Sequence, residues 1–291
     1  MRIHRTRAPA KVNLTLHVLG RRSDGYHEIR SLMVPLSLAD ELEVGVGATV
    51  DGISVPGRPD LEVPENLCLR AVASFRRHVG PIPGVHVRLE KRIPTAAGLG
   101  GGSSDAAAVL RCLARESGIS IDDPRLLRAA LEVGSDVPFF LRSEPALVGG
   151  RGEHLFPAPP LPDGIPLVLV HPPFEVSAGE AYRALAEERR GNAPPPPPRP
   201  GALADPEAVS HILHNDLEAP VASRYPIRPL LRELEEAGAL AALMSGSGPT
   251  VFGVFSEAKA AEEGARTLSG RPDREVWVVT AGRSHATLDP P

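Results

Sequence analysis

Glycine fills four of the five positions from 98 to 102, directly before an alanine-rich segment, in the stretch PTAAGLGGGSSDAAAVLR (94–111). Because glycine has no Cβ atom, the backbone N–H groups of such a loop can wrap closely around a ligand. We expect a helix over residues 104–115, with Ser103 or Ser104 as its N-cap. A helix N-terminus presents unpaired donors and a positive dipole end, so the segment predicts a polyphosphate site. It is not a P-loop, since no Gly-Lys-Ser/Thr follows, and a flexible turn before an ordinary helix is the alternative interpretation.

A second cluster of glycine and serine, SGSGPT, covers residues 245–250. By itself this cluster is typical of a hairpin loop. Two such loops, one in each half of the chain, favour a cleft between two domains that holds a phosphorylated ligand from both sides.

The composition excludes several classes of protein. Glycine (28 residues) and proline (32) make up about a fifth of the 291 residues, but hydrophobic (42%) and charged (23%) fractions are those of a globular chain. A net charge of −4 with 4% aromatic residues does not suggest a nucleic-acid partner. No apolar run is long enough for a spanning helix and no leader-like segment begins the chain, so we expect no membrane association and a cytoplasmic location. Cys68 and Cys112 fit buried thiols, and the histidines show no metal-ligand spacing.

Hydrophobic periodicity predicts an α+β fold in two domains, 1–158 and 159–291, with the boundary in the proline-rich segment PAPPLP (157–162). Strands are expected near 12–18, 42–46, 85–89, 165–170, 243–244, 251–255 and 276–279. Helices are expected over 66–79, 104–115, 124–132, 177–189, 228–237 and 257–268. The order of elements after the boundary resembles a split βαβ sandwich. The run NAPPPPPRPG (192–201) should form an exposed, PPII-like loop.

Three segments in this order, PAKVNL (9–14), the glycine loop (94–105) and SGSGPT (245–250), resemble the motifs of the GHMP kinases. That resemblance covers essentially the whole chain. It implies an N-terminal domain of the ribosomal-protein-S5-like type, a ferredoxin-like C-terminal domain, an active-site cleft between them, and ATP with Mg²⁺ as cofactors. It assigns ATP to Asn66 and to the loop residues Pro94, Ala96, Ala97, Gly98, Leu99, Gly100, Gly101, Gly102, Ser103 and Ser104.

Further segments, GRRSDGYHE (20–28), GSDVP (134–138) and HNDL (214–217), narrow the resemblance within the family. They are similar to the branch that phosphorylates the 2-hydroxyl of 4-diphosphocytidyl-2-C-methyl-D-erythritol, giving the 2-phosphate and ADP in the non-mevalonate (MEP) route to isoprenoid (terpenoid) precursors. Ser135, where the family commonly has alanine, and the proline run depart from the pattern. The alternatives are another small-molecule kinase of the family and a non-catalytic nucleotide-binding protein on the same scaffold.

Two residues are the candidates for chemistry. Asp136, between Gly134 and an apolar segment, suits a general base that accepts the hydroxyl proton, with a turn or capping aspartate as the alternative. Lys11 is its natural partner, because an ammonium group near the carboxylate keeps it ionised and makes the acceptor hydroxyl more acidic. Period-2 alternation places Asn13 on the same strand face as Lys11.

The remaining candidates contact ligands. Tyr26 can stack on a pyrimidine and His27 can hydrogen-bond its edge; the resemblance assigns their segment to cytosine and adds Tyr182 on the expected helix 177–189. Tyr182 is equally well explained as a core-facing residue, and Asn66 as a helix N-cap. Asn13, Gly246, Ser247 and Gly248 are expected at the substrate, and Ser104 at Mg²⁺ or the β-phosphate. Asp216 is better explained as structural. The expected partner is the small-molecule substrate, with the chain a monomer or weak homodimer.

Overall fold

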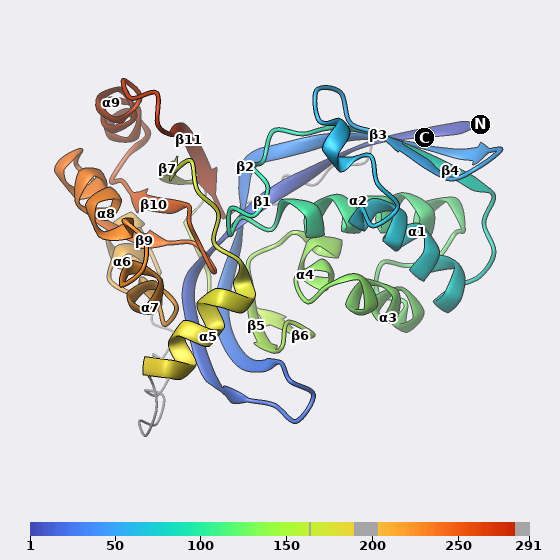
Figure 1. The fold of residues 1–291 in the computed structure, drawn as a ribbon, viewed down its shortest axis with the longest axis horizontal. Coiled ribbons are helices and arrows are strands. Elements are labelled where there is room, and N and C mark those ends of the chain that lie inside the picture. Colours follow the sequence, from blue (N-terminus) through green and yellow to red (C-terminus); the bar gives the residue numbers. More distant parts are fainter. Residues whose placement is uncertain (163, 189–202, 283–291) are drawn as a thin grey trace.

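The computed structural model describes residues 1–162, 164–188 and 203–282, which form two halves joined by long strands (Figure 1). Two long strands, β1 (Arg2–Arg21) and β2 (His27–Ala48), pair with each other in antiparallel orientation over most of their length. One end of β2 pairs with β4, and its other end pairs with β5. The smaller strands extend these edges, β3 beside β4 and β6 beside β5. Their bounds are β3 (Gly52–Ser54), β4 (Gly84–Glu90), β5 (Ala146–Gly150) and β6 (His154–Pro157).

The second half adds strands to the same sheet, so the sheet is continuous between the halves. Its order is β11-β7-β10-β9, and β11 meets β2 where Ala281 lies opposite Leu36. The short strand β8 runs parallel to β1 beside Thr15 and Leu16. The bounds are β7 (Ile165–His171), β8 (His214–Asn215), β9 (Ala241–Met244), β10 (Val251–Val254) and β11 (Glu275–Ala281).

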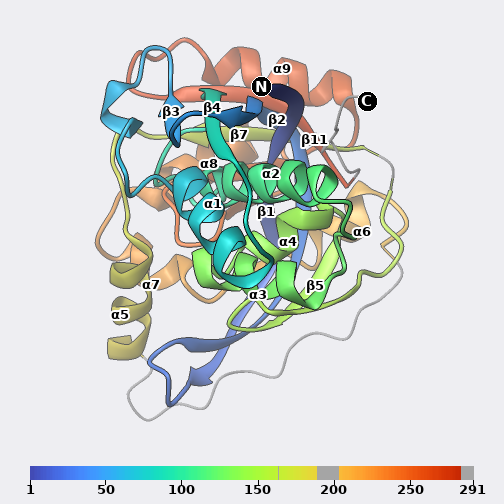
Figure 2. The ribbon, with the colours of Figure 1, turned by 90° about the vertical axis from the view of Figure 1, so that its right-hand side faces the viewer.

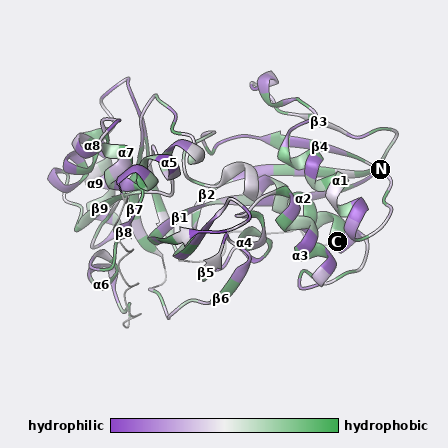
Figure 3. Ribbon diagram, turned by 60° about the horizontal axis from the view of Figure 1, so that its bottom comes forward, coloured by the Kyte–Doolittle hydropathy of each residue, from purple (hydrophilic) through white to green (hydrophobic). Residues whose placement is uncertain are grey.

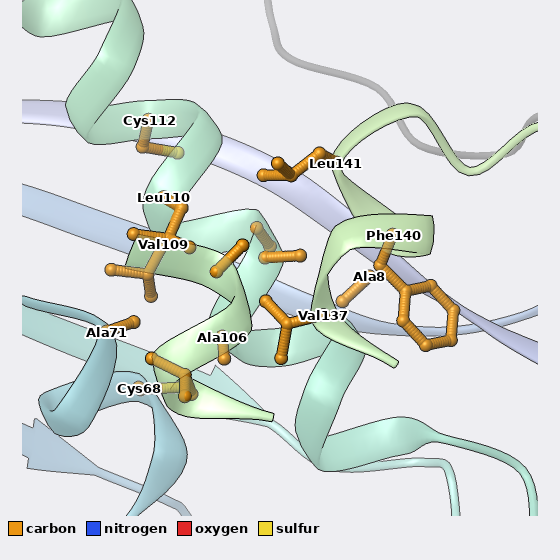
Figure 4. Packing of buried hydrophobic residues seen from close by; sticks show 14 of the residues in the cluster. Ala8, Cys68, Ala71, Ala106, Val109, Leu110, Cys112, Val137, Phe140 and Leu141 are labelled. Atoms are coloured by element: carbon orange, nitrogen blue, oxygen red, sulfur yellow. The ribbon is translucent and has the colours of Figure 1, made fainter. Parts of the chain in front are cut away.

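Helices of the first half cover one side of the long strands, as Figure 2 shows. They are α1 (Leu67–His78), α2 (Gly101–Glu116), α3 (Pro124–Val133) and α4 (Val137–Arg142), after a 3₁₀ turn over Pro59–Leu61. Helix α3 has both purple and green segments in Figure 3, because hydrophilic and hydrophobic residues are interspersed along it, and it buries Leu126 and Ala129 while Arg125 is exposed. Helix α2 is buried along most of its length, since its alanines let neighbouring elements approach closely. Figure 4 shows Ala106 and Leu110 of α2 among side chains of β1, α1 and α4.

Helices of the second half pack on its strands and on one another. They are α5 (Ala178–Glu188), α6 (Pro206–Ser210), α7 (Glu218–Ala222), α8 (Ile227–Glu236) and α9 (Ala258–Leu268). A core cluster spans both halves, because Val12, Leu14 and Val34 from the long strands pack in one group with Leu167 and Phe252. The two halves therefore share buried apolar surface.

The strands and helices expected from periodicity are all present, and the proposed boundary falls in the connection from β6 to β7. Both cysteines are buried and free, as expected. The proline run 192–201 lies outside the described residues. No helix within the described ranges has the length and apolar character to cross a membrane.

One expectation about α2 was wrong. The helix begins at Gly101 rather than Ser104, and its N-cap is Gly100 in the left-handed conformation (φ 71°), with no side-chain cap. Glycine adopts this conformation at little cost, so the turn needs no serine hydroxyl. The first-turn N–H groups are left for another acceptor.

Candidate active site

Two cavities meet at the glycine loop. The large cavity, about 750 Å³, is lined by residues of both halves, among them Lys11, Asp136, Tyr26, Tyr182 and Ser247. The small cavity, about 420 Å³, lies between the loop and the start of α1. Gly98, Gly100 and Ser103 line both cavities, so the loop forms the boundary between them.

Lys11 lines the large cavity beside this boundary, on β1 next to a register shift after Pro9. Its backbone N–H donates to the Leu99 carbonyl over 3.0 Å. The side chain is almost fully buried, and its Nζ donates to Asn13 Oδ1 (2.7 Å) and to the Gly98 carbonyl (2.9 Å). Burial lowers the pKa of Lys11, and the nearby charge of Asp136 opposes that shift. Asn13 is itself fixed, because its Nδ2 donates to Ser31 Oγ over 2.7 Å.

Asp136 lies opposite Lys11, at the N-cap position of α4. Its Oδ2 is 4.0 Å from Lys11 Nζ, and its side chain is 36% exposed against 5% for the lysine. The carboxylate makes no side-chain cap hydrogen bond to its own helix. Asp136 is therefore near the ammonium group yet open to the large cavity, as a base that must meet an acceptor hydroxyl would be.

The two glycine loops touch each other beside Lys11. The Gly98 carbonyl accepts hydrogen bonds from Lys11 Nζ and from Ser245 Oγ, the latter over 3.0 Å. Gly98 has φ 74° and Gly246 has φ 57°. A Cβ atom on Gly98 would lie 2.2 Å from the Ser245 carbonyl oxygen, and one on Gly246 would lie 3.1 Å from Lys11 Nζ. The contact between the halves thus requires glycine at both positions.

The small cavity gathers most residues that the resemblance assigned to ATP. Pro94, Ala96, Ala97, Gly98, Gly100, Gly101, Gly102, Ser103 and Asn66 all line it. Asn66 also caps α1, since its Oδ1 accepts from the Cys68 N–H over 2.9 Å. Leu99 and Ser104 are instead buried and are not among the lining residues of either cavity.

Sequence reasoning missed a buried charged group on the wall of the small cavity. Lys91 Nζ donates to Asp105 Oδ2 over 2.9 Å and also to Asp40 Oδ2. Burial raises the pKa of Asp105, and the neighbouring Asp40 adds to that shift while Lys91 opposes it. The three residues lie on β2, on the segment after β4 and on α2, so no local spacing signals the group.

Aromatic residues also line the large cavity. His27 and Tyr182 stack with ring centroids 4.6 Å apart, and Arg151 Cζ lies 4.8 Å from the centroid of the half-exposed Tyr26 ring. Partial burial and the charge of Arg21 lower the pKa of His27, which favours a neutral ring that can both donate and accept. Arg21 and Arg151 also line this cavity. Arg21 belongs to the GRRSDGYHE segment (20–28), whereas no sequence pattern singles out Arg151.

Two family profiles match this chain, one in each half. The profile described as "GHMP kinases N terminal domain" matches residues 66–144, and "GHMP kinases C terminal" matches residues 202–272. The chain belongs to the GHMP kinases.

Similar relatives of this GHMP kinase are named 4-diphosphocytidyl-2-C-methyl-D-erythritol kinase. One from Anaeromyxobacter dehalogenans (strain 2CP-C) is 52% identical and covers 98% of this chain and 93% of its own. One from Symbiobacterium thermophilum is 44% identical, covering 93% and 96%.

Solved structures agree with this assignment. A crystal structure of 4-(cytidine 5'-diphospho)-2C-methyl-D-erythritol kinase has a TM-score of 0.78 at 37% identity, covering 96% of this chain and 100% of that one. A homoserine kinase from Cytophaga hutchinsonii has a TM-score of 0.74 at 17% identity, covering 99% and 98%, and so shows the fold alone. The expected two-domain GHMP kinase fold is therefore confirmed.

In this GHMP kinase the HNDL segment supports the second glycine loop. Asn215 Nδ2 donates to the carbonyls of Met244 (2.7 Å) and Gly246 (2.8 Å). Asp216 Oδ2 accepts from the Val18 N–H over 2.7 Å, which fits the structural role expected for it. Gly246 and Ser247 line the large cavity, whereas Gly248 packs against Met244 and is not among its lining residues.

The fold also brings together His17, His214 and Asp216, whose ligand atoms lie within 4.8 Å of one another although the sequence shows no metal-ligand spacing. The two imidazole rings are stacked, with an interplanar angle of 11°, and His214 Nε2 is hydrogen-bonded to Asp216 Oδ1 over 2.8 Å. Because ring nitrogens bind metals in the ring plane, stacked rings do not converge on one ion.

Proposed function

We propose that this GHMP kinase transfers the γ-phosphoryl group of ATP to the 2-hydroxyl of 4-diphosphocytidyl-2-C-methyl-D-erythritol. The observation that carries the proposal is the Lys11–Asp136 pair, which lines the large cavity beside the glycine loop that separates it from the small one. A nucleotide in one cavity and an acceptor in the other would meet at that pair. The names of the relatives at 44–52% identity support this acceptor.

The small cavity suits ATP. Its glycine-lined wall presents the free N–H groups at the start of α2, which favour phosphate oxygens. The large cavity suits the acceptor, since Tyr26, His27 and Tyr182 offer ring faces and a neutral imidazole edge to a pyrimidine. Arg21 and Arg151 give this cavity the positive charge that a diphosphate requires.

The proposed chemistry needs few groups. Asp136 accepts the proton of the 2-hydroxyl while the hydroxyl oxygen bonds to the γ-phosphorus and the bond from that phosphorus to the ADP oxygen breaks. Lys11 donates hydrogen bonds to two fixed acceptors, so its charge is held beside the reacting atoms. Phosphoryl transfer depends mainly on positioning and charge neutralisation, which the lysine and the loop N–H groups provide.

Mg²⁺ fits the oxygen donors at the boundary of the cavities. Ser103 lines both cavities, and its hydroxyl, with phosphate oxygens and water, would supply the hard oxygen ligands that Mg²⁺ prefers. Ser104 remains a candidate, because its buried Oγ has no hydrogen-bond partner among the described residues. When bound, Mg²⁺ would neutralise phosphate charge.

The setting of the reaction follows from its substrates. ATP and a nucleotide-linked acceptor are cytoplasmic metabolites, so we place the enzyme in the cytoplasm. That the chain is a monomer or weak homodimer is a separate proposal. Size-exclusion chromatography with light scattering tests the oligomeric state.

Substrate-dependent release of ADP tests the proposed function. Purified protein with ATP and Mg²⁺ should release ADP with 4-diphosphocytidyl-2-C-methyl-D-erythritol and much more slowly with mevalonate or homoserine, the acceptors of kinases with the same fold. ADP release with mevalonate or homoserine alone would assign the chain to another acceptor. No release with any acceptor would favour a nucleotide-binding protein without activity.

A further inference from the structure

Arg111 is a buried cation in the middle of α2, the helix whose N-terminus carries the glycine loop. It is 5% exposed and has apolar neighbours along the helix. Burial lowers the pKa of Arg111 to about 10, which still leaves the guanidinium charged at neutral pH. Among the described residues, no carboxylate pairs with it. A buried charge without a counter-ion is costly, so its hydrogen bonds need an explanation.

The guanidinium bonds instead to two other elements. Its Nη1 donates to the Phe140 carbonyl of α4 over 2.6 Å. Its Nη2 donates to the Arg7 carbonyl of β1 (2.8 Å) and to Thr6 Oγ1 (3.3 Å). We call these three contacts the Arg111 bridge. Phe140 lies in the last turn of α4, where carbonyl groups lack helical partners and a positive charge is favourable.

The bridged elements are those that carry the reacting residues. Arg7 precedes Lys11 on β1, and Asp136 is the N-cap of the six-residue helix α4. Gly100 of the glycine loop also packs against both elements, because a Cβ on Gly100 would lie 2.9 Å from the Phe140 ring and 3.2 Å from Lys11 Cε. Figure 4 shows Ala8 of β1 next to Phe140 of α4 in the core.

We propose that Arg111 is a positioning residue that sets the separation between Lys11 and Asp136, an inference that rests on the proposed function. The guanidinium fixes β1 and α4 to the helix that holds the nucleotide loop. It thereby determines the 4.0 Å distance from Lys11 Nζ to Asp136 Oδ2. A planar group with several fixed donors suits this role better than an ammonium group.

The test compares Arg111→Met and Arg111→Lys with Cys112→Ala, a matched change at the next buried position of the same helix. All are assayed below their unfolding temperatures, as checked by circular dichroism. Displacing reacting groups by about 1 Å can cost about 100-fold in rate, so Arg111→Met should lose about that much kcat with KM for ATP nearly unchanged. Arg111→Lys should retain part of the rate, and Cys112→Ala should keep kcat while losing stability. A wild-type kcat in Arg111→Met overturns the proposal.

Two further measurements keep the proposal falsifiable. If Arg111→Met does not fold, Arg111→Lys decides, and a wild-type kcat in that variant overturns the bridge. Labelling of Lys11 by an acylating amine reagent, followed by mass spectrometry, needs no turnover. It should be faster in the Arg111 variants than in Cys112→Ala, and equal rates overturn the bridge. If the wild-type protein releases no ADP, the proposed function fails, while the labelling comparison still tests the bridge.

Discussion

The protonation of Lys11 should limit activity at high pH. Burial lowers the pKa of Lys11, so its ammonium group is lost at lower pH than that of an exposed lysine. At a pH between the pKa of Lys11 in the folded protein and its pKa in the unfolded chain, the lysine is protonated mainly in the unfolded chain. The free energy of unfolding therefore rises with pH in this range because of Lys11, while kcat falls as the folded protein loses the ammonium group. We therefore expect kcat at saturating substrates to decline below the ordinary lysine pKa without loss of folded protein. If kcat stays constant as the pH is raised up to the ordinary lysine pKa, the result contradicts the role given to Lys11.

Tyr26 should contribute to acceptor binding and not to ATP binding. Stacking of a base on an aromatic ring is worth about 1–3 kcal/mol, so Tyr26→Ala should raise KM for the acceptor roughly 5- to 150-fold. Phe156→Ala is the matched control, because Phe156 is an exposed aromatic residue away from both cavities. Steady-state kinetics with each substrate varied in turn check this. Equal effects of the two substitutions would show that Tyr26 does not contact the base.

Some residues of the proposed site could be singled out from the sequence and others could not. Lys11, Asp136 and the glycine loop stand in motifs, so a family resemblance selects them. Lys91, Asp40 and Arg111 have no local signal, because their partners lie on other elements and only the fold brings them together. Ser104 was expected at a ligand, yet it is buried, while Ser103 lines both cavities.

The contact between the two glycine loops makes Gly246 a critical position in its loop. Gly246→Ala would place a Cβ 3.1 Å from both the Gly98 carbonyl oxygen and Lys11 Nζ. We expect a large loss of kcat, because Lys11 must move. Gly118→Ala is the control, since Gly118 also has a positive φ (66°) but a Cβ there would meet no other atom within 4 Å. Both variants should lose about 1 kcal/mol of stability from backbone strain. Equal kcat values in the two variants would mean that the loop contact does not matter for catalysis.

Helices with one apolar face were predictable, whereas the first part of β2 was not. Residues 31–36 of that strand are all buried, so the period-2 pattern that reveals a half-exposed strand is absent. The start of α2 was misplaced for a different reason. A serine-based cap was expected, but glycine itself supplies the left-handed N-cap.

The two halves should not fold independently if cut at the proposed boundary. Strand pairing of β11 with β2 and the core cluster shared by Leu14, Val34 and Phe252 cross that boundary. A fragment of residues 1–158 would expose the long-strand side of this cluster. We expect it to be aggregated or to lack a cooperative thermal transition, as judged by circular dichroism and light scattering. A cooperative transition in the isolated fragment would show that the first half is an autonomous domain.

The central claim is that Asp136 acts as the base beside Lys11. The measurement that tests it most directly is kcat of Asp136→Asn, with ATP affinity and the unfolding transition determined on the same protein. Since general-base catalysis contributes about 100- to 10,000-fold, kcat should fall by at least about 100-fold while ATP affinity and stability stay near wild type. A kcat within about twofold of wild type, at full occupancy of both substrates, would contradict the account.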